Sequence, residues 1–400
     1  MSLQVSSSTV RPVAIKKRLR IAILNRTFSP TGGGAERYSI ALVEQLAAQH
    51  EIHVFAQKID HQWPGVTYHS VSAPLHRPRW INQLWFAAST WWSTRHGFDV
   101  VHSHENTWHG DIQTVHVLPV KYNMFHGRVG WRRFLRWIKV IISPRLLAYL
   151  GLEYFRYAKR PGRQVIVTAN SLLSIINSSY PTCSEMLSVI TPGITMPKLA
   201  VTLERKNQAR SLLGLPLIGR YALLIGNDYR KKGLQVVLNA MAQLPVDISL
   251  IVVGNPAQIS LFTDQVKTLN LVNRIFFLGH LKDVTPAYEA ADCLVHPTLE
   301  DTFAMVVLEA MSHGLPVVVS GPKYCGIAEL LQHGINAVIL DDPQDASQVC
   351  YSLELVLAET ALQSRLSKGA IAFAGQYQWH QIALEQERVY FLAATEKVII

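Results

Sequence analysis

Cysteine is scarce in this chain, and charged side chains are few for its length. Four cysteines occur in 400 residues, and charged residues make up 16% of the total. The cysteines form no CxxC pair and no spacing typical of metal ligands; they are Cys183, Cys293, Cys325 and Cys350. A disulfide scaffold and a zinc module are therefore not expected, and a reducing cytoplasmic compartment suits the sequence best.

Long uninterrupted apolar runs are missing as well. The first twenty residues hold no apolar run of signal-peptide length, because a cluster of four cations leads directly into residues 21–24. The most apolar later stretch, residues 137–152, is interrupted by Lys139, Pro144 and Arg145. It falls short of the roughly 20 apolar residues that a membrane-spanning helix needs. We expect neither a secretion signal nor a membrane span.

Acidic residues are few in the first half of the chain. Residues 1–200 carry 23 Lys and Arg against 9 Asp and Glu, a net +14, whereas residues 201–400 carry 15 against 19, a net −4. The N-terminal half is therefore expected to face something anionic, such as nucleic acid, a phosphorylated glycan or anionic lipid. No zinc-finger, RRM-like or helix-turn-helix signature is present, so nucleic acid is not an expected partner.

Short β-branched runs alternate with longer helical patterns along the whole chain, which is typical of parallel βαβ units. The predicted strands lie at residues 19–24, 51–56, 66–71, 99–104, 112–117, 164–169, 187–190, 221–225, 248–253, 274–278, 292–296, 316–320 and 337–340. The pattern predicts two doubly wound parallel sheets that face each other. Because ligands bind beyond the carboxyl ends of such strands, the functional residues should lie in strand-to-helix loops around a shared cleft.

The division of the chain follows from the same pattern. A largely polar stretch bounded by prolines, residues 197–216, places the domain boundary near residue 198. The predicted parts are a disordered tail at 1–17, an N-terminal domain at 18–198, a C-terminal domain at 199–378, and a helix at 379–400 that packs back toward the N-terminal domain.

Two loops have the composition of a phosphate site. After the first strand, Gly32, Gly33 and Gly34 open a helical pattern, and such glycines let backbone N–H groups and the positive end of a helix reach a phosphate. In the second half, three cations at residues 230–232 follow a buried strand and precede Gly233, which suits a diphosphate. The alternatives are an ordinary glycine turn and a solvated basic turn.

Residues 296–316 form the most informative segment. A strand ends at His296, a short acidic loop with Glu300 and Asp301 follows, and an apolar helix starts near Phe303. Glu309 lies within the apolar run of that helix. A buried glutamate is unfavourable without a partner, and the paired hydroxyls of a ligand would supply one. The alternative is a glutamate on the wet face of the helix.

Histidines gather in the first half. His116 ends the fifth predicted strand, where its imidazole would hydrogen-bond a donor sugar or an acceptor hydroxyl; a structural role is the alternative. His102, His104 and His109 form another cluster, but no acidic partner spacing demands a metal. We expect no metal site and no cofactor.

Taken together, these motifs resemble the family-4 retaining glycosyltransferases of the GT-B fold. The acidic segment is similar to the E-x7-E signature of that family, written here as Asp301-x7-Glu309. The resemblance extends over nearly the whole chain, through residues 33–37, 114–116, 189–194, 226–233, 277–279 and 378–379. Residues 230–233 with 245–246, and residues 324–326 ahead of residue 329, resemble bacterial lipopolysaccharide core glucosyltransferases that act on heptose.

The resemblance implies a UDP-sugar donor, with UDP-glucose expected, and roles for particular residues. Glu309 would bind the ribose hydroxyls, and Asp301 would bind the hydroxyls of the transferred sugar. The catalytic candidates are His116, Asp301 and Lys232. The pyrophosphate would be bound by Lys231, Lys232, the amides of Gly33 and Gly34 and the helix start at Phe303, Ala304, Met305 and Val306. Gly226 would complete the donor site. Gly279, His280 and Leu281 would lie against the base.

Three positions depart from the family pattern. The first acid is Asp301 preceded by Glu300, so either carboxylate is a candidate for the sugar contact. Asn227 stands where many relatives place a phosphate-binding arginine, and Ala304 replaces the usual glycine of the helix start.

The expected mechanism follows from absent motifs as well. No DxD-type pair stands in a suitable loop, so cations and helix dipoles are expected to stabilise the departing UDP without a metal. No carboxylate pair brackets a glycosidic bond as in hydrolases. The resemblance implies retention through a short-lived oxocarbenium-like ion pair, in which the leaving diphosphate helps to remove the acceptor proton.

The acceptor side is basic and aromatic. The densest piece is Trp131, Arg132, Arg133 and Arg136 within residues 131–139. Such a segment predicts an interfacial contact with an anionic membrane at the inner face of the cytoplasmic membrane. The alternative is a packed helix with solvated arginines.

The expected acceptor is an anionic glycan or glycolipid of lipopolysaccharide core or other cell-envelope polysaccharide synthesis. Two other functions fit the same architecture, a non-catalytic carbohydrate- or lipid-binding scaffold and a nucleotide-sugar epimerase.

Overall fold

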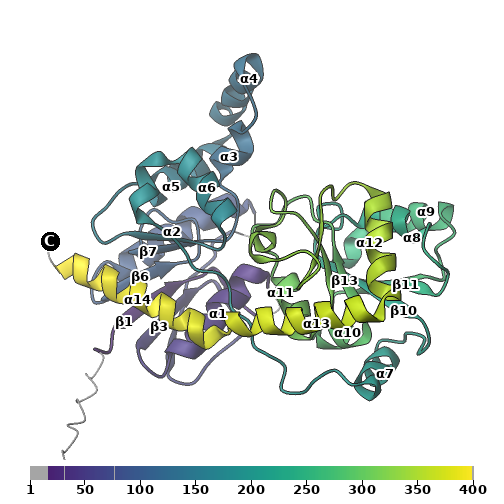
Figure 1. Ribbon diagram of the computed structural model, residues 1–400. Helices are drawn as coiled ribbons and strands as arrows, with labels where there is room; N and C mark the ends of the chain where they lie inside the picture. Colours follow the sequence, from purple (N-terminus) through teal and green to yellow (C-terminus); the bar gives the residue numbers. More distant parts are fainter. Residues whose placement is uncertain (1–16, 31, 76, 399–400) are drawn as a thin grey trace, which may run out of the picture.

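The computed structural model describes residues 17–30, 32–75 and 77–398. Two parallel sheets lie side by side, with helices on the faces of each (Figure 1). The prediction of two doubly wound sheets is confirmed. Residues 1–16 of the predicted tail lie outside the described residues.

The N-terminal sheet has the strand order β5-β3-β1-β6-β7-β8-β9, and its neighbouring strands are all parallel. Its strands are β1 (Arg20–Leu24), β3 (Glu51–Ala56), β5 (Val66–Ser70), β6 (Val100–Ser103), β7 (Ile112–Val115), β8 (Gln164–Val167) and β9 (Leu187–Val189). Four successive residues of β1 are buried, as expected of a parallel strand covered on both faces.

The C-terminal sheet has the order β12-β11-β10-β13-β14-β15 and is also parallel. Its strands are β10 (Arg220–Gly226), β11 (Ile248–Gly254), β12 (Ile275–Gly279), β13 (Cys293–His296), β14 (Val317–Ser320) and β15 (Val338–Leu340). Strand order reverses beside the first strand of each sheet, at β1/β6 and at β10/β13. Such reversals open a crevice at the carboxyl ends of the strands.

Each predicted strand is present, with boundaries that shift by a few residues at most. One small sheet was not predicted, the pair β2 (Thr27–Phe28) and β4 (Lys58–Ile59). Two residues are too short a run to show a period of two, so the pattern of the sequence does not reveal this pair.

The helices fall into the same two groups. The first group is α1 (Gly34–Leu46), α2 (Arg79–Thr94), α3 (Val120–Phe125), α4 (Gly130–Ile141), α5 (Pro144–Arg156) and α6 (Asn170–Ser179). The second is α7 (Leu203–Leu212), α8 (Leu234–Met241), α9 (Ser260–Thr268), α10 (Thr285–Ala290), α11 (Met305–Ser312), α12 (Ala346–Ala358) and α13 (Thr360–Ala374). Short 3₁₀ helices lie at Pro181–Met186, Pro256–Gln258, Gly326–Leu330 and Gly375–Tyr377.

The last helix, α14 (Trp379–Val398), returns to the N-terminal sheet (Figure 1). Its Trp379 and Tyr390 belong to the same buried cluster as Ile21 and Leu42. At the crossing, Ile194 and Tyr377 pair their backbones, with a distance of 2.7 Å between the amide nitrogen and the carbonyl oxygen. The two connections between the sheets therefore run side by side.

Helices α3 and α4 project from the N-terminal half (Figure 1). Met124, Val140 and Leu146 form a small apolar cluster at their base, and the backbone amides of Val120 and Lys121 donate to Glu153 of α5. In the part of the chain that the structure describes, no helix has both the length and the apolar character needed to cross a membrane.

Candidate functional site

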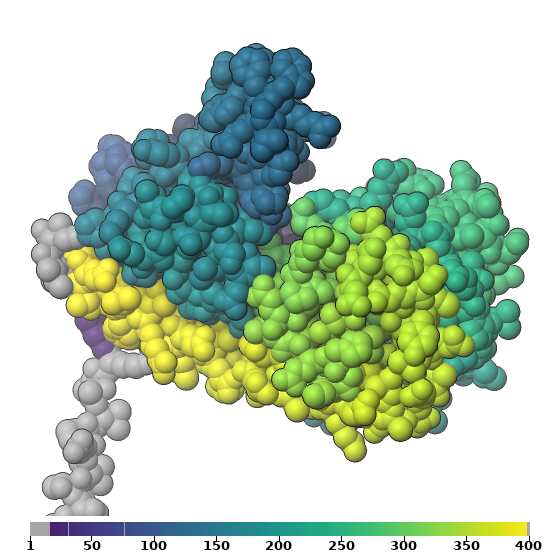
Figure 2. All heavy atoms as spheres, turned by 45° about the horizontal axis from the view of Figure 1, so that its top comes forward, coloured from purple at the N-terminus to yellow at the C-terminus, as the bar shows by residue number. Residues whose placement is uncertain are grey.

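A cavity of about 810 Å³ lies between the two sheets, at the carboxyl ends of their strands. The boundary between the two halves is hollowed there (Figure 2). The predicted site residues that line it are Gly33, Gly34 and His116 from the N-terminal half, and Gly226, Lys232, His280, Leu281, Asp301, Phe303, Ala304, Met305, Val306 and Glu309 from the C-terminal half.

Lys232 and Asp301 form an ion pair at the floor of this cavity. Nε2 of His296, which is fully buried, lies 3.3 Å from the same Asp301 carboxylate. Burial alone would raise the pKa of Asp301, but the hydrogen bond from His296 and the charge of Lys232 outweigh it and hold that pKa well below its usual range. Asp301 therefore stays a carboxylate at neutral pH, paired with Lys232.

Gly226 makes room for the lysine. A Cβ atom built on Gly226 would overlap Cγ of Lys232, so a side chain there would displace the lysine stem. Gly233, with φ of 78°, adopts a left-handed backbone conformation, and a Cβ on it would overlap the carbonyl oxygen of Pro297. These two glycines let the basic turn pass close to the acidic loop.

The acidic loop leads directly into α11. Oδ1 of Asp301 accepts the backbone N–H of Ala304 at 2.9 Å, and helix α11 begins one residue later, at Met305 rather than near Phe303 as the sequence predicts. Ala304 has φ of 74° and ψ of 69°. Among the described residues, the amides of Met305 and Val306 meet no acceptor at the positive end of the helix, which is the geometry that binds phosphate.

Glu309 faces the cavity and is held from both sides of it. Its Oε1 accepts a hydrogen bond from Nη1 of Arg37 at 2.6 Å, and its Oε2 accepts one from the hydroxyl of Tyr288 at 2.6 Å. The glutamate side chain is 14% exposed, which argues against the wet-face alternative. Arg37 comes from α1 of the opposite half, so this ion pair crosses the cleft.

A second hydrogen bond also crosses the cleft. Oγ1 of Thr302 donates to the backbone carbonyl of His116 at 2.9 Å. The His116 ring packs edge-on against Tyr38, with 5.1 Å between ring centroids. Burial, reinforced by the positive charge of Arg156, lowers the pKa of His116 to about 3, so the imidazole is neutral at physiological pH.

Two predicted donor residues lie outside the cavity. The ammonium of Lys231 pairs with Glu300 at 3.0 Å and its side chain is 54% exposed, so the structure places it on the outer face of the basic turn. Gly279 ends β12 and does not line the cavity, whereas the next two residues, His280 and Leu281, do. Adjacent cations in a turn point in different directions, which spacing alone does not reveal.

The Gly33 loop also carries a carboxylate. A Cβ built on Gly33 would lie 3.0 Å from Oε2 of Glu36, so Glu36 covers the start of α1, where a carboxylate is favoured by the helix dipole. A phosphate that approaches these amides must displace or avoid Glu36.

Sequence reasoning missed several contributors. Tyr288 and His296 each bind an acid of the signature, yet neither occupies a position with a distinctive motif. Arg37 stands in the quoted motif of residues 33–37, but only the fold shows its carboxylate partner. Among residues 17–398, leaving out 31 and 76, no group of three or more His, Cys, Asp or Glu side chains is arranged to hold a metal ion.

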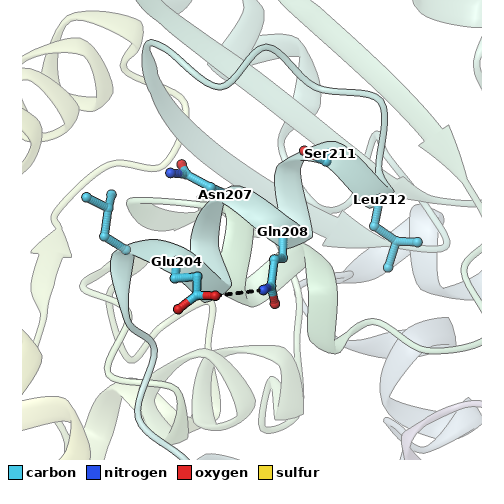
Figure 3. Close-up of a pocket in the computed structure, with 6 residues that line it drawn as sticks. Glu204, Asn207, Gln208, Ser211 and Leu212 are labelled. Carbon is cyan, nitrogen blue, oxygen red and sulfur yellow. Dashed lines mark hydrogen bonds between the residues drawn. The ribbon is translucent and has the colours of Figure 1, made fainter.

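Another hollow lies on helix α7 (Figure 3). It is lined by Leu203, Glu204, Asn207, Gln208, Ser211 and Leu212, and Nε2 of Gln208 donates to Glu204 at 3.3 Å. Side chains of one helix line it, and none of the predicted site residues does.

Two family models match the chain, one for each sheet. The model described as Glycosyltransferase Family 4 matches residues 32–196, and the model described as Glycosyl transferases group 1 matches residues 207–373. Together they span most of both domains.

Individual proteins are similar as well. D-inositol 3-phosphate glycosyltransferase of Corynebacterium diphtheriae is 26% identical over 320 residues, which are 71% of this chain and 74% of that protein. The crystal structure of WaaG, a glycosyltransferase involved in lipopolysaccharide biosynthesis, matches with a TM-score of 0.78 at 19% identity, over 92% of this chain and 98% of that one. HepE of Anabaena, in complex with UDP-glucose, matches with a TM-score of 0.71 at 18% identity, over 92% and 98% of the two chains. These two structural likenesses concern the fold.

Proposed function

Because the chain belongs to the glycosyltransferases of the GT-B fold, we propose that it transfers a hexose, with retention of configuration, from a UDP-sugar to a glycan or glycolipid acceptor. The observation that carries the proposal is the cavity between the domains, which brings Lys232, the start of α11 and Glu309 together around one space. A cation, a row of free amides and a carboxylate are the groups that a nucleoside diphosphate needs for its phosphates and ribose.

The roles follow from charge and position. Lys232 and the amides of Met305 and Val306 bind the pyrophosphate and stabilise the negative charge of the departing UDP. Glu309 accepts hydrogen bonds from the ribose hydroxyls. To do so, its carboxylate either breaks the ion pair with Arg37 or bonds to Arg37 and the ribose together. Asp301, held ionised by Lys232 and His296, accepts hydroxyl groups of the transferred sugar.

The reaction is proposed to need no metal. Lys232 supplies one positive charge inside the cavity, and Arg37 supplies a second at its edge. The acceptor oxygen attacks the face that the leaving UDP has just vacated, and the diphosphate oxygen takes its proton. An inverted anomer in the product, observed by NMR, would rule out this retaining course.

The donor is proposed to be UDP-glucose and the acceptor an anionic glycan or glycolipid of the cell envelope, including lipopolysaccharide core. Two structural relatives support this choice, because HepE of Anabaena binds UDP-glucose in its crystal structure and WaaG is involved in lipopolysaccharide biosynthesis. The basic N-terminal half supports an anionic acceptor, because its net charge over residues 1–200 is +14 from 23 Lys and Arg against 9 Asp and Glu.

Contact with the inner face of the cytoplasmic membrane is proposed for α4. One face of this helix presents Trp131, Phe134 and Ile141, which are 68%, 57% and 66% exposed. The adjoining face presents Arg132 and Arg136, which line a shared hollow of about 600 Å³ with Lys139. Adjoining apolar and cationic faces are typical of a helix that lies in a membrane interface.

The experiment that tests the function measures UDP release from UDP-glucose, UDP-galactose, UDP-N-acetylglucosamine and GDP-mannose by the purified protein. Changing Glu309→Ala should raise the KM for the UDP-sugar roughly tenfold to a hundredfold, because charged hydrogen bonds to the ribose are lost. Changing Lys232→Met should lower kcat by about a hundredfold, since the leaving diphosphate loses a cation.

Lys231→Met is the matched control, because its ammonium points away from the cavity, and we expect it to retain the activity of the unaltered protein. A protein that releases no UDP from any of these donors would instead be the non-catalytic scaffold. Interconversion of two sugar nucleotides without transfer would identify the epimerase.

A further inference from the structure

His116 belongs to a row of packed imidazoles behind the cleft. Nδ1 of His104 lies 3.0 Å from Nε2 of His116, and the two ring planes differ by 15°. Tyr38 packs against both rings, with centroid distances of 5.8 Å to His104 and 5.1 Å to His116. The contact between the two imidazoles is therefore a well-defined hydrogen bond with little freedom to rearrange.

This hydrogen bond uses one nitrogen of each ring and leaves the other two in different surroundings. Nε2 of His104 is buried and meets no hydrogen-bond partner among the described residues. Nδ1 of His116 forms no hydrogen bond to the described protein, and His116 lines the cleft. Nδ1 is thus the nitrogen of His116 that is left for a ligand.

The neighbouring His102 does not satisfy the buried nitrogen of His104. Its ring is close, with 4.3 Å between centroids, but both of its nitrogens are occupied. Nδ1 of His102 lies 2.8 Å from the hydroxyl of Tyr390, and Nε2 lies 2.7 Å from that of Thr114.

Either His104 or His116 can donate in the hydrogen bond between them. The donor is decided by which form of the unpaired Nε2 of His104, an N–H or a lone pair, is tolerated in a buried position. Burial holds the pKa of His104 well below its usual range, as it does for His116, so each ring carries one N–H and one lone pair. If His116 donated, Nε2 of His104 would be a buried N–H without an acceptor. If His104 donates, only a lone pair is left unpaired, and buried N–H groups without an acceptor are the rarer of the two.

We propose that His104 is a positioning residue that donates from Nδ1 to Nε2 of His116 and thereby fixes His116 as the Nδ1–H tautomer, a neutral hydrogen-bond donor pointing into the cleft. Its ligand is an oxygen atom of the sugar nucleotide, on the transferred sugar or the diphosphate. His116 then does not accept the proton of the acceptor hydroxyl, because Nδ1 already carries a hydrogen. The identity of the ligand rests on the proposed function, whereas the tautomer does not.

The first test reads the tautomer directly in the full chain without substrate. Long-range ¹H–¹⁵N correlation spectra of protein labelled at histidine distinguish Nδ1–H, Nε2–H and imidazolium rings. The His116 signals are assigned by their loss in His116→Gln. We expect the Nδ1–H pattern at pH 7; an Nε2–H or an imidazolium pattern would overturn the proposal.

The second test replaces His104 by two side chains that are equal to each other in size and differ in whether they can donate a hydrogen bond. His104→Asn places an amide N–H where Nδ1–H stood, so we expect the His116 spectrum and kcat to stay near those of the unaltered protein. His104→Asp places an acceptor there, so His116 should switch to the Nε2–H tautomer and kcat should fall by about a hundredfold, with a smaller change in KM. A His104→Asp protein that keeps the Nδ1–H tautomer would contradict the positioning role.

Thermal melts show whether both variants fold; if His104→Asp does not, the spectra of the unaltered protein and of His104→Asn still decide the question. Failure of this inference and failure of the proposed function are distinguishable. The expected tautomer in a protein that transfers no sugar leaves the positioning intact and refutes only the enzymatic role.

Discussion

At the scale of single residues, Ala304 shows how the acidic loop is strained into place. Its φ of 74° and ψ of 69° lie in the left-handed region, where the Cβ of an L-residue crowds the backbone. The family resemblance has glycine at this position. In this conformation the amide of Ala304 donates to Oδ1 of Asp301 at 2.9 Å.

Ala304→Gly should therefore raise the free energy of unfolding by about 1 kcal/mol, because relief of a roughly 1–2 kcal/mol conformational cost exceeds the entropy that glycine adds to the unfolded chain. Urea denaturation followed by circular dichroism measures the change. Asn270, with φ of 56°, is the matched control, because asparagine tolerates this region and Asn270→Gly should change stability little. Equal effects of the two substitutions would contradict the explanation.

Two neighbouring lysines that look alike in the sequence occupy different places in the structure. Lys231 and Lys232 are adjacent, yet the first pairs with Glu300 outside the cavity and the second with Asp301 inside it. The packing of Lys232 over Gly226 places this side chain, and not that of Lys231, at the cavity.

At the scale of elements, two faces of α4 have different neighbours. Its buried Val140 packs on α3 and α5, and on the same side the guanidinium carbon of Arg133 lies 5.9 Å from the ring centre of Phe125. Arg132 and Arg136, one turn apart, point instead to the exposed hollow. The predicted trio of arginines is thus divided between two faces.

This division predicts unequal effects on membrane binding. Arg132→Gln and Arg136→Gln should each weaken partition into vesicles that contain anionic lipid by about 1 kcal/mol, roughly fivefold, because each removes a cation near the headgroups. Arg133→Gln should have less effect. Flotation of the purified protein with liposomes measures the partition, and vesicles of neutral lipid serve as the control.

Three equal losses would indicate a diffuse electrostatic attraction without the proposed orientation of α4. Absence of binding by the unaltered protein would refute the membrane contact itself and leave the solvated helix as the correct interpretation.

At the scale of the whole molecule, buried histidines make stability depend on pH. Burial, with nearby positive charges, lowers the pKa of His102 and of His109 to about 3, whereas an unfolded chain has a histidine pKa near ~6.5. Between these values the unfolded chain binds protons that the folded chain does not. The free energy of unfolding therefore falls as pH falls from about 6.5 toward 3.

Each such histidine should contribute a slope of up to ~1.4 kcal/mol per pH unit in this window. Urea midpoints measured from pH 7.5 down to pH 4.5 test it. His109→Gln should reduce the slope by up to ~1.4 kcal/mol per pH unit, because unfolding then takes up one proton fewer. A slope that His109→Gln does not alter would show that this ring is accessible to protons in the folded state.

Much of the architecture was predictable from particular segments. Residues 21–24, 222–225 and 293–295 are short apolar runs, and they lie in the central strands β1, β10 and β13. Buried parallel strands need such runs because helices cover both of their faces. The pair β2 and β4 was not predictable, since two residues show no periodicity.

The candidate site was predictable in part. Glycines beside a helix start, a cation after a strand and an acid in a loop each have a local signature, and the cavity contains Gly33, Lys232 and Asp301. Pairs of residues that lie far apart in the chain have no such local signature. Arg37 meets Glu309 across 272 positions of sequence, and His104 meets His116 through the register of two strands.

The sequence by itself determined the two parallel sheets and the loops that carry the chemistry, because burial of apolar runs and the carboxyl ends of strands are local consequences of composition and order. Only the tertiary structure decided which neighbouring lysine enters the cavity, which carboxylate is held ionised, and which nitrogen of His116 faces it. Those outcomes depend on distances between side chains from different strands and domains, and the spacing of residues along one chain does not specify such distances.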